Sequence, residues 1–223
     1  MELVQSGSLS SGVVFGALVL FSLILVISFY WGGRRNLKII RSVASLLEDA
    51  LHPIDKQYTW LGGTVGFRAS YRIKGFRDVV ASLTVVPRQS LLYLPVAFIR
   101  GAYDRLEILF FLEGPIDEEI HLIRGREIKR FIPDRERINS LDKKSIEYRD
   151  ETVWLLFSKE QGRLYKLFSS NLQRLFGPAL CHIAVVPERG TFYLNYRVRS
   201  NDISSLKEEI RAALKFIKRY MLK

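Results

Sequence analysis

Twenty consecutive residues without a charged side chain run from Gly12 to Trp31 and read GVVFGALVLFSLILVISFYW. As an α-helix that rises about 1.5 Å per residue, such a stretch spans about 30 Å, the thickness of the hydrocarbon core of a bilayer. The sequence therefore predicts a transmembrane helix over residues 12–31. A cleaved signal peptide is the alternative, but it requires a basic segment before a shorter apolar stretch, and residues 1–11 contain one acid and no base.

The residues around the end of this stretch predict its orientation. Tyr30 and Trp31 stand where aromatic side chains favour the membrane interface, and the bases Arg34, Arg35 and Lys38 follow directly. Because bases beside a span favour the cytoplasmic side, we expect the short N-terminus to lie outside and everything after the span to lie in the cytoplasm. The expected location is the cell membrane, or the endoplasmic reticulum membrane in a eukaryote.

The composition of the chain limits the kinds of protein that it can be and the partners that it can bind. The 223 residues are 48% hydrophobic, which excludes an intrinsically disordered protein. The chain after residue 33 carries 34 bases against 22 acids, a formal charge of +12. This charge favours anionic lipid head groups or nucleic acid, including ribosomal RNA, as partners, with a generic basic surface as the alternative. The single cysteine, Cys181, excludes an intrachain disulfide framework and a cysteine-rich zinc site.

Helical spacing of apolar residues resumes soon after the predicted span. Pro53 ends a pattern in which they recur every three or four positions, at Leu37, Ile40, Ala44, Leu47 and Leu51. We therefore expect residues 32–57 to form a juxtamembrane helix and a linker. Residues 58–223 are then the folded cytoplasmic domain.

The pattern within this domain predicts an α+β fold with an antiparallel sheet. Strict alternation over residues 65–73 predicts a strand, and Lys74-Gly75 turns the chain into a second strand over residues 78–86, which makes a hairpin. The remaining predicted elements are, in order, a helix at 88–99 that Pro95 bends or divides, a strand at 104–112 with a short partner at 119–123, a helix at 126–138 disturbed at Pro133, strands at 144–149 and 152–157, a helix at 161–176, strands at 180–186 and 191–198, and a helix at 202–222. Their order predicts two ββαββα pseudo-repeats, at about 58–140 and 141–223.

Residues that could perform catalysis do not form a recognisable motif. His52, His121 and His182 fall in unrelated segments without metal-binding spacing. Cys181 and His182 are adjacent, but neighbours on a strand point to opposite faces and could not share a proton. We therefore predict no catalytic residue, no metal and no cofactor. A lipid-handling or hydrolytic enzyme stays an alternative that would need a pocket of convergent polar groups.

The order of segments resembles the calumin family, the coiled-coil-containing endoplasmic reticulum membrane protein that joins Asterix in the PAT complex. In that family a strand runs into Arg-Gln-Asp-Leu-Leu, a short helix, and then an Asp that begins the next strand. The residues that match this motif here are Arg88, Gln89, Leu91, Leu92 and Asp104, while Ser90 replaces the Asp.

The resemblance implies a non-enzymatic chaperone or adaptor beside the Sec translocon and the ribosome, acting in the insertion of multipass membrane proteins. The family's acidic luminal region and its C-terminal coiled coil are both missing, so calcium binding is not implied. The chain would then be a short, archaeal-like form of the family.

The remaining expectations concern contacts with partners. The terminal helix ends in the bases Lys215, Lys218 and Arg219, which are the candidate contact with a ribosome or another partner. A structural assembly subunit that binds another membrane protein without nucleic acid is the second hypothesis. A basic domain that binds the lipid surface is the third.

Overall fold

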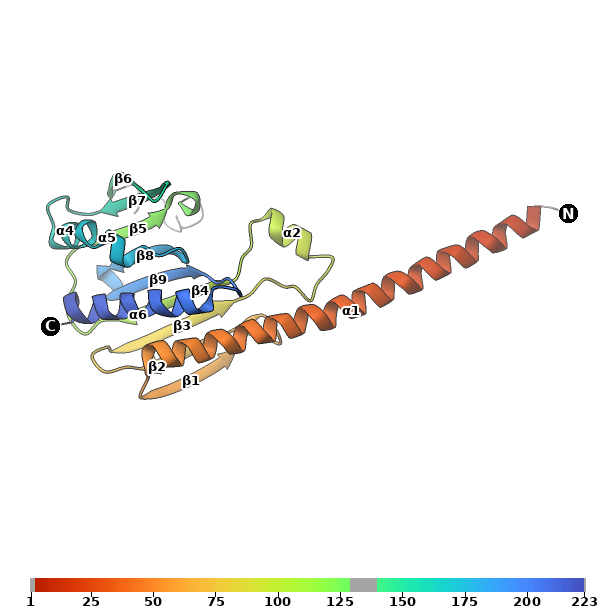
Figure 1. Cartoon of the computed structure of the whole chain (residues 1–223), viewed down its shortest axis with the longest axis horizontal. Coiled ribbons are helices and arrows are strands. Elements are labelled where there is room, and N and C mark those ends of the chain that lie inside the picture. Colours follow the sequence, from red (N-terminus) through yellow and green to blue (C-terminus); the bar gives the residue numbers. More distant parts are fainter. Residues whose placement is uncertain (1–2, 129–139, 223) are drawn as a thin grey trace.

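A long helix and one sheet organise the chain in this computed structural model, which describes residues 3–128 and 140–222 (Figure 1). The helix α1 (Leu3–Leu51) contains 49 residues, and about two thirds of it extends away from the domain. It joins the predicted span and the predicted juxtamembrane helix without a break. By length and composition it could cross a membrane, and no residue of its most apolar window is buried in the domain.

Within residues 3–128 and 140–222, nine strands form a single antiparallel sheet in the order β1-β2-β3-β4-β9-β8-β5-β7-β6. This confirms a domain of antiparallel sheet and helices. The strands are β1 (Asp55–Trp60), β2 (Gly66–Arg72), β3 (Asp78–Thr84), β4 (Arg105–Phe111), β5 (Ile120–Arg124), β6 (Asp142–Tyr148), β7 (Glu151–Phe157), β8 (Leu180–Val186) and β9 (Thr191–Arg197).

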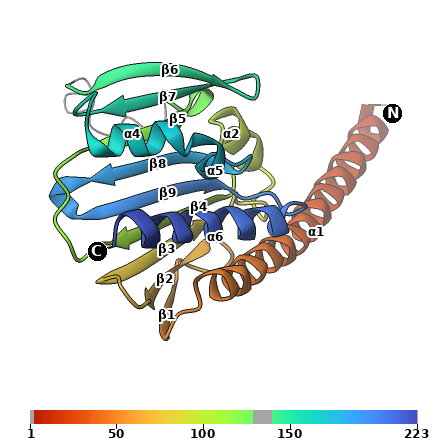
Figure 2. The ribbon, with the colours of Figure 1, turned by 60° about the vertical axis from the view of Figure 1, so that its left-hand side comes forward.

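Several helices cover one face of this sheet (Figure 2). The second half of α1 lies beside the terminal helix α6 (Ile203–Tyr220), and α4 (Arg163–Ser170) and α5 (Leu172–Leu175) lie over β5 and β8. Their apolar side chains and those of the sheet share one core. At the surface, Lys207 of α6 bonds the carboxylate of Asp49 at 3.0 Å, which ties α6 to α1.

Several predicted elements are confirmed. The β2–β3 hairpin forms as expected, with Phe67, Ala69 and Tyr71 buried and the intervening residues of β2 from Arg68 onwards exposed. The helix α6 forms within the predicted range 202–222 and buries one apolar side, which includes Leu206, Ile210, Leu214 and Ile217. The helix α1 ends at Leu51, directly before the predicted stop at Pro53.

Three predicted local structures are wrong. The helix at 88–99 is only α2 (Leu94–Ile99), which begins beside Pro95, because proline is compatible with the first turn of a helix. The helix at 161–176 divides at Asn171, whose side chain bonds the carbonyl of Leu167 at 2.9 Å and competes with the helical pattern. The strand β1 was not predicted: its first three residues fall at the end of the expected linker, and its exposed residues show no alternation that would identify an edge strand.

The pairing of β5 also differs from the prediction. It lies between β7 and β8, not beside β4, which is flanked by β3 and β9. All five residues of β5 are buried, as befits a central strand. The two predicted units therefore share one sheet, and the pseudo-repeat stays a prediction. Of the predicted helix at 126–138, the structure describes only the start, a 3-10 turn at Gly125–Glu127 followed by Ile128.

Candidate functional site at the helix exit

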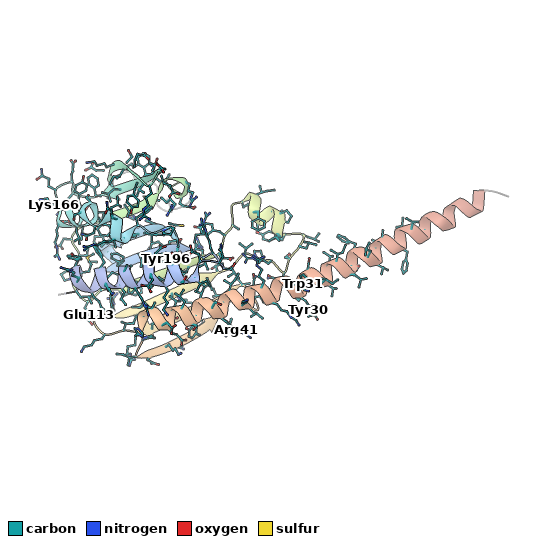
Figure 3. All side chains as sticks on the ribbon, in the orientation of Figure 1. Tyr30, Trp31, Arg41, Glu113, Lys166 and Tyr196 are labelled. Atoms are coloured by element: carbon teal, nitrogen blue, oxygen red, sulfur yellow. The ribbon has the colours of Figure 1, made fainter. Side chains whose placement is uncertain are left out.

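The domain has two ends, and α1 leaves it at only one of them. Trp31 is 75% exposed, whereas Asn36, five residues further on, is fully buried. We call the end at residues 31–36 the helix exit. Figure 3 shows Tyr30 and Trp31 on α1 just outside the domain, with Glu113 and Lys166 at the opposite, distal end.

A buried polar cluster joins α1 to the sheet at the helix exit. The amide nitrogen of Asn36 donates to the carbonyl of Val86 at 2.9 Å, to the carbonyl of Thr64 at 3.1 Å and to Oε1 of Gln89 at 3.1 Å. Its Oδ1 accepts from Arg88 at 3.0 Å. Asn36 therefore connects α1 to two loops that are distant in the sequence.

The cluster is completed by an ion pair between Arg88 and Asp104. The guanidinium contacts both carboxylate oxygens, at 2.8 and 2.7 Å. Oδ1 also accepts from the backbone N–H of Val86 at 2.8 Å, so this buried carboxylate has three donors. Such pairing offsets the cost of removing both charges from water. We call Asn36, Arg88, Gln89 and Asp104 the polar joint.

Gly32 allows α1 to come into direct contact with the backbone of residues 88 and 89. A Cβ on Gly32 would lie 2.2 Å from the carbonyl oxygen of Arg88, closer than any real contact allows. On Gly33, a Cβ would meet its nearest atom, Cγ2 of Thr64, at an ordinary 3.7 Å. The backbone of residues 88 and 89 therefore rests directly on the helix at Gly32.

Beyond the polar joint, residues 88–103 form a lobe with an apolar surface, which we call the α2 lobe. Its exposed large apolar side chains are Leu92, Tyr93, Val96, Phe98 and Ile99. On the β1–β2 side, three more exposed apolar residues stand at the same end, namely Trp60, Leu61 and Val65. Exposed apolar side chains in this number at one end of a domain indicate a candidate interaction surface.

This surface is a functional feature that the sequence interpretation missed. The run LLYLPVAFI was available as a signal, but it was interpreted only as part of a helix at 88–99, without an exposed apolar surface. Only Ala97 of α2 is buried.

An open groove separates the lobe from α1. Its volume is about 490 Å³. One wall consists of Leu25, Val26, Phe29 and Tyr30, and the other of Gln89, Ser90, Leu91 and Leu92. Three residues of the family motif, Gln89, Leu91 and Leu92, thus line the groove. Gln89 also belongs to the polar joint, as do the other two motif residues, Arg88 and Asp104.

The predicted basic residues lie at opposite ends of the domain. Arg34, Arg35 and Lys38 are exposed on α1 at the helix exit. Lys215, Lys218 and Arg219 are exposed on the last turns of α6, which ends at the distal end (Figure 1). The structure does not bring these two groups together.

A second polar cluster lies within the sheet. Nδ1 of His121 is 3.1 Å from Nε2 of His182, and Nε2 of His121 is 2.9 Å from Glu119. The ring of His182 also packs edge-on against Tyr193. Burial, helped by the neighbouring His121, holds the pKa of His182 well below 6.5.

The sequence argument about Cys181 and His182 used the wrong geometry. A β-bulge between Leu180 and His182 interrupts simple alternation. Cys181 packs with Ile123 and its thiol contacts the carbonyl of Ala179 at 3.8 Å, while His182 is engaged with His121. Burial raises the pKa of the thiol, which disfavours the reactive thiolate.

The His182 environment predicts an acid sensitivity. Since its folded-state pKa is depressed, the folded state binds fewer protons than the unfolded state below pH 6.5. The contribution of His182 to the free energy of unfolding is therefore fully present above about pH 6.5. It is lost as the pH falls, by up to about 1.4 kcal/mol per pH unit. The variant His182→Gln should flatten this slope in unfolding experiments between about pH 8 and pH 5.5. The exposed His52→Asn is the control, and an equal slope in wild type and His182→Gln would refute the assignment.

Metal ligands do not converge in the part of the chain that the structure describes: no group of three His, Cys, Asp or Glu residues is placed to hold an ion there. A scan against protein-family models and a search of curated proteins found no match for this chain. The resemblance to the calumin family therefore stays a prediction.

Proposed function

We propose that this chain is a single-pass membrane-anchored adaptor without catalytic activity of its own, acting on the cytoplasmic face of the membrane. One observation carries the proposal: α1 continues without interruption from its apolar half into the core of the domain. A flexible linker would let a domain tumble near the membrane. A continuous helix locked by the polar joint instead directs one end of the domain to the bilayer and the other away from it.

The orientation in the membrane follows from the charge beside the apolar segment. Arg34, Arg35 and Lys38 stand at the helix exit, where the bilayer surface would be. Bases beside a span favour the cytoplasm, so the domain is cytoplasmic and the N-terminus external. These bases then contact anionic head groups, and Tyr30 and Trp31 occupy the interface.

The distal end is the side that a soluble partner can reach. Lys215, Lys218 and Arg219 are exposed on neighbouring turns of α6, so they present their charges on one side of the helix. A polyanion suits this surface, and the resemblance to the calumin family suggests a ribosome engaged at the Sec translocon. Assistance in the insertion of multipass membrane proteins is the corresponding proposed role.

Charge reversal at the distal end tests this role. Replacing Lys215, Lys218 and Arg219 by Glu should weaken co-sedimentation of the full chain with ribosomes. For each phosphate that the variant no longer neutralises, the slope of log affinity against log salt should fall by about 0.7 to 0.9. The control reverses Arg68, Arg72 and Lys74, exposed bases on and directly after β2, with the same change in net charge. Unchanged binding, or equal losses in both variants, would count against the assignment.

The runner-up is an assembly subunit that binds another membrane protein within the bilayer, without nucleic acid. The favouring observation is the exposed apolar surface of α1 beside the α2 lobe. Crosslinking in native membranes separates the two proposals. Ribosomal and translocon products support the adaptor, while a single stoichiometric membrane partner supports the assembly subunit.

A further inference from the structure

The α2 lobe exposes more apolar surface than its position in a water-soluble domain would require. Ile99 is 86% exposed and Leu92 is 67% exposed. The polar joint fixes the lobe where it begins, at Arg88, and again where β4 begins, after Asp104. The apolar side chains are therefore presented outward by a rigid support.

The first residues of the lobe, 89–92, lie beside the last part of the apolar helix. Leu25 and Leu92 face the same groove, and Leu25 precedes Trp31 by six residues. At about 1.5 Å per residue, the groove reaches about 9 Å back along the apolar segment from its aromatic end. Interfacial helices bury their apolar side about 5–10 Å into the boundary between head groups and acyl chains. The two depths agree.

Basic residues flank the apolar surface of the lobe and the end of the apolar helix. Arg100 is exposed at the end of α2, and Arg34 and Arg35 are exposed on α1 just beyond the aromatic residues. Positive side chains at this level suit the phosphates of anionic lipids. The remaining exposed surface of α2 is apolar, as a lipid-facing surface would be.

We infer that the α2 lobe is a lipid-binding element that enters the same leaflet as the end of α1, and that a phospholipid acyl chain occupies the groove between them. The inference rests on the membrane anchoring in the proposed function and adds a second membrane contact to it. The occupant is a bilayer lipid because one wall of the groove is the apolar segment itself, continuous with the surface that lipid covers.

Site-directed fluorescence in the full-length chain tests this inference. Single cysteines replace Ile99 in the lobe, Ile54 at the distal end and Val19 within the apolar segment. Ile54 is the matched control, since it is an isoleucine that is 71% exposed on the same domain. Cys181 can stay in place because it is buried, and the unsubstituted chain gives the labelling background. Each variant is labelled with a polarity-sensitive dye and reconstituted into phosphatidylcholine–phosphatidylglycerol vesicles with spin-labelled acyl chains.

We expect the dye at position 99 to emit at shorter wavelength and to lose fluorescence to the spin-labelled lipids, as the dye at position 19 does. The dye at position 54 should remain in water and keep its emission. A Leu92→Cys variant, labelled in the groove, should be quenched more by spin labels near the head groups than by labels at the bilayer centre.

The outcomes separate the two proposals. If position 99 behaves like position 54 while position 19 is quenched, the chain is anchored but the lobe is not in lipid, and the inference is overturned. If Leu92→Cys alone escapes quenching, the lobe enters the leaflet but the groove holds no acyl chain, and that part is overturned. If position 19 is not quenched, the membrane anchoring itself fails, and the proposed function fails with it.

Discussion

Replacing Asp104 by alanine should destabilise the domain by about 3–5 kcal/mol, because the variant leaves a largely buried guanidinium without its counter-charge. Arg88 donates to both carboxylate oxygens in the native state. The substitution also removes the acceptor for the N–H of Val86. Chemical denaturation of the full chain in mild detergent, followed by near-ultraviolet circular dichroism, measures the loss.

A double variant distinguishes the cost of an unpaired charge from the value of the pair. Arg88→Met with Asp104→Leu removes both charges, and apolar replacements of a buried pair are often neutral or stabilising. We expect the double variant to lose clearly less stability than Asp104→Ala, although the Val86 N–H loses its acceptor and Oδ1 of Asn36 loses its donor Arg88. If the double variant were as unstable as the single one, the ion pair would not be the source of the effect.

The second large effect is expected at Gly32. Replacing it by alanine should lower the free energy of unfolding by about 1–3 kcal/mol, because the added methyl group overpacks the contact. A Cβ there would lie 2.2 Å from the backbone oxygen of Arg88, and backbone held by the polar joint cannot move aside easily. This cost exceeds the gain of about 1 kcal/mol that alanine brings to a helix interior. The α2 lobe should separate from α1, which the dye at position 99 would report.

Gly33 supplies the matched control for this prediction. Gly33→Ala introduces the same methyl group one residue later in the same helix, where its nearest neighbour lies at 3.7 Å. We expect this variant to be neutral or more stable, by up to about 1 kcal/mol. Equal stability changes in the two variants would show that helix propensity, and not contact with Arg88, dominates at both positions.

Both predictions concern the same physical property, the rigidity of the joint between the apolar helix and the domain. The polar joint and the approach at Gly32 together set the position of the α2 lobe relative to α1. Variants that loosen them should therefore reduce any contact that depends on the lobe while leaving the distal bases of α6 unaffected.

Part of the helix exit was predictable from the sequence. Arg88 and Asp104 were named only as residues that match a family motif, and neither their ion pair nor their contact with Asn36 was predicted. Asn36 precedes Ile39, Ile40 and Val43 on the buried stripe of α1, so an amide at helical spacing from apolar residues was a usable signal. Its partners Thr64 and Val86 could not be identified, because they depend on how two loops meet.

The sequence alone determined the features that arise from local chemistry. These are an apolar segment long enough for a bilayer, the bases at its end, the β2–β3 hairpin, and the amphipathic terminal helix. Each depends on periodicity or composition within one segment, where side chains a few residues apart must share an environment.

Only the tertiary structure decided which distant segments meet. It placed β5 between β7 and β8, made β1 an edge strand, and turned the apolar run of the α2 lobe outward beside α1. An apolar run can face a core or a membrane with the same local pattern, and a strand does not encode its neighbours. The neighbours of a strand and the side that an apolar run faces depend on the free energy of the whole fold, which cannot be inferred from one segment of the sequence.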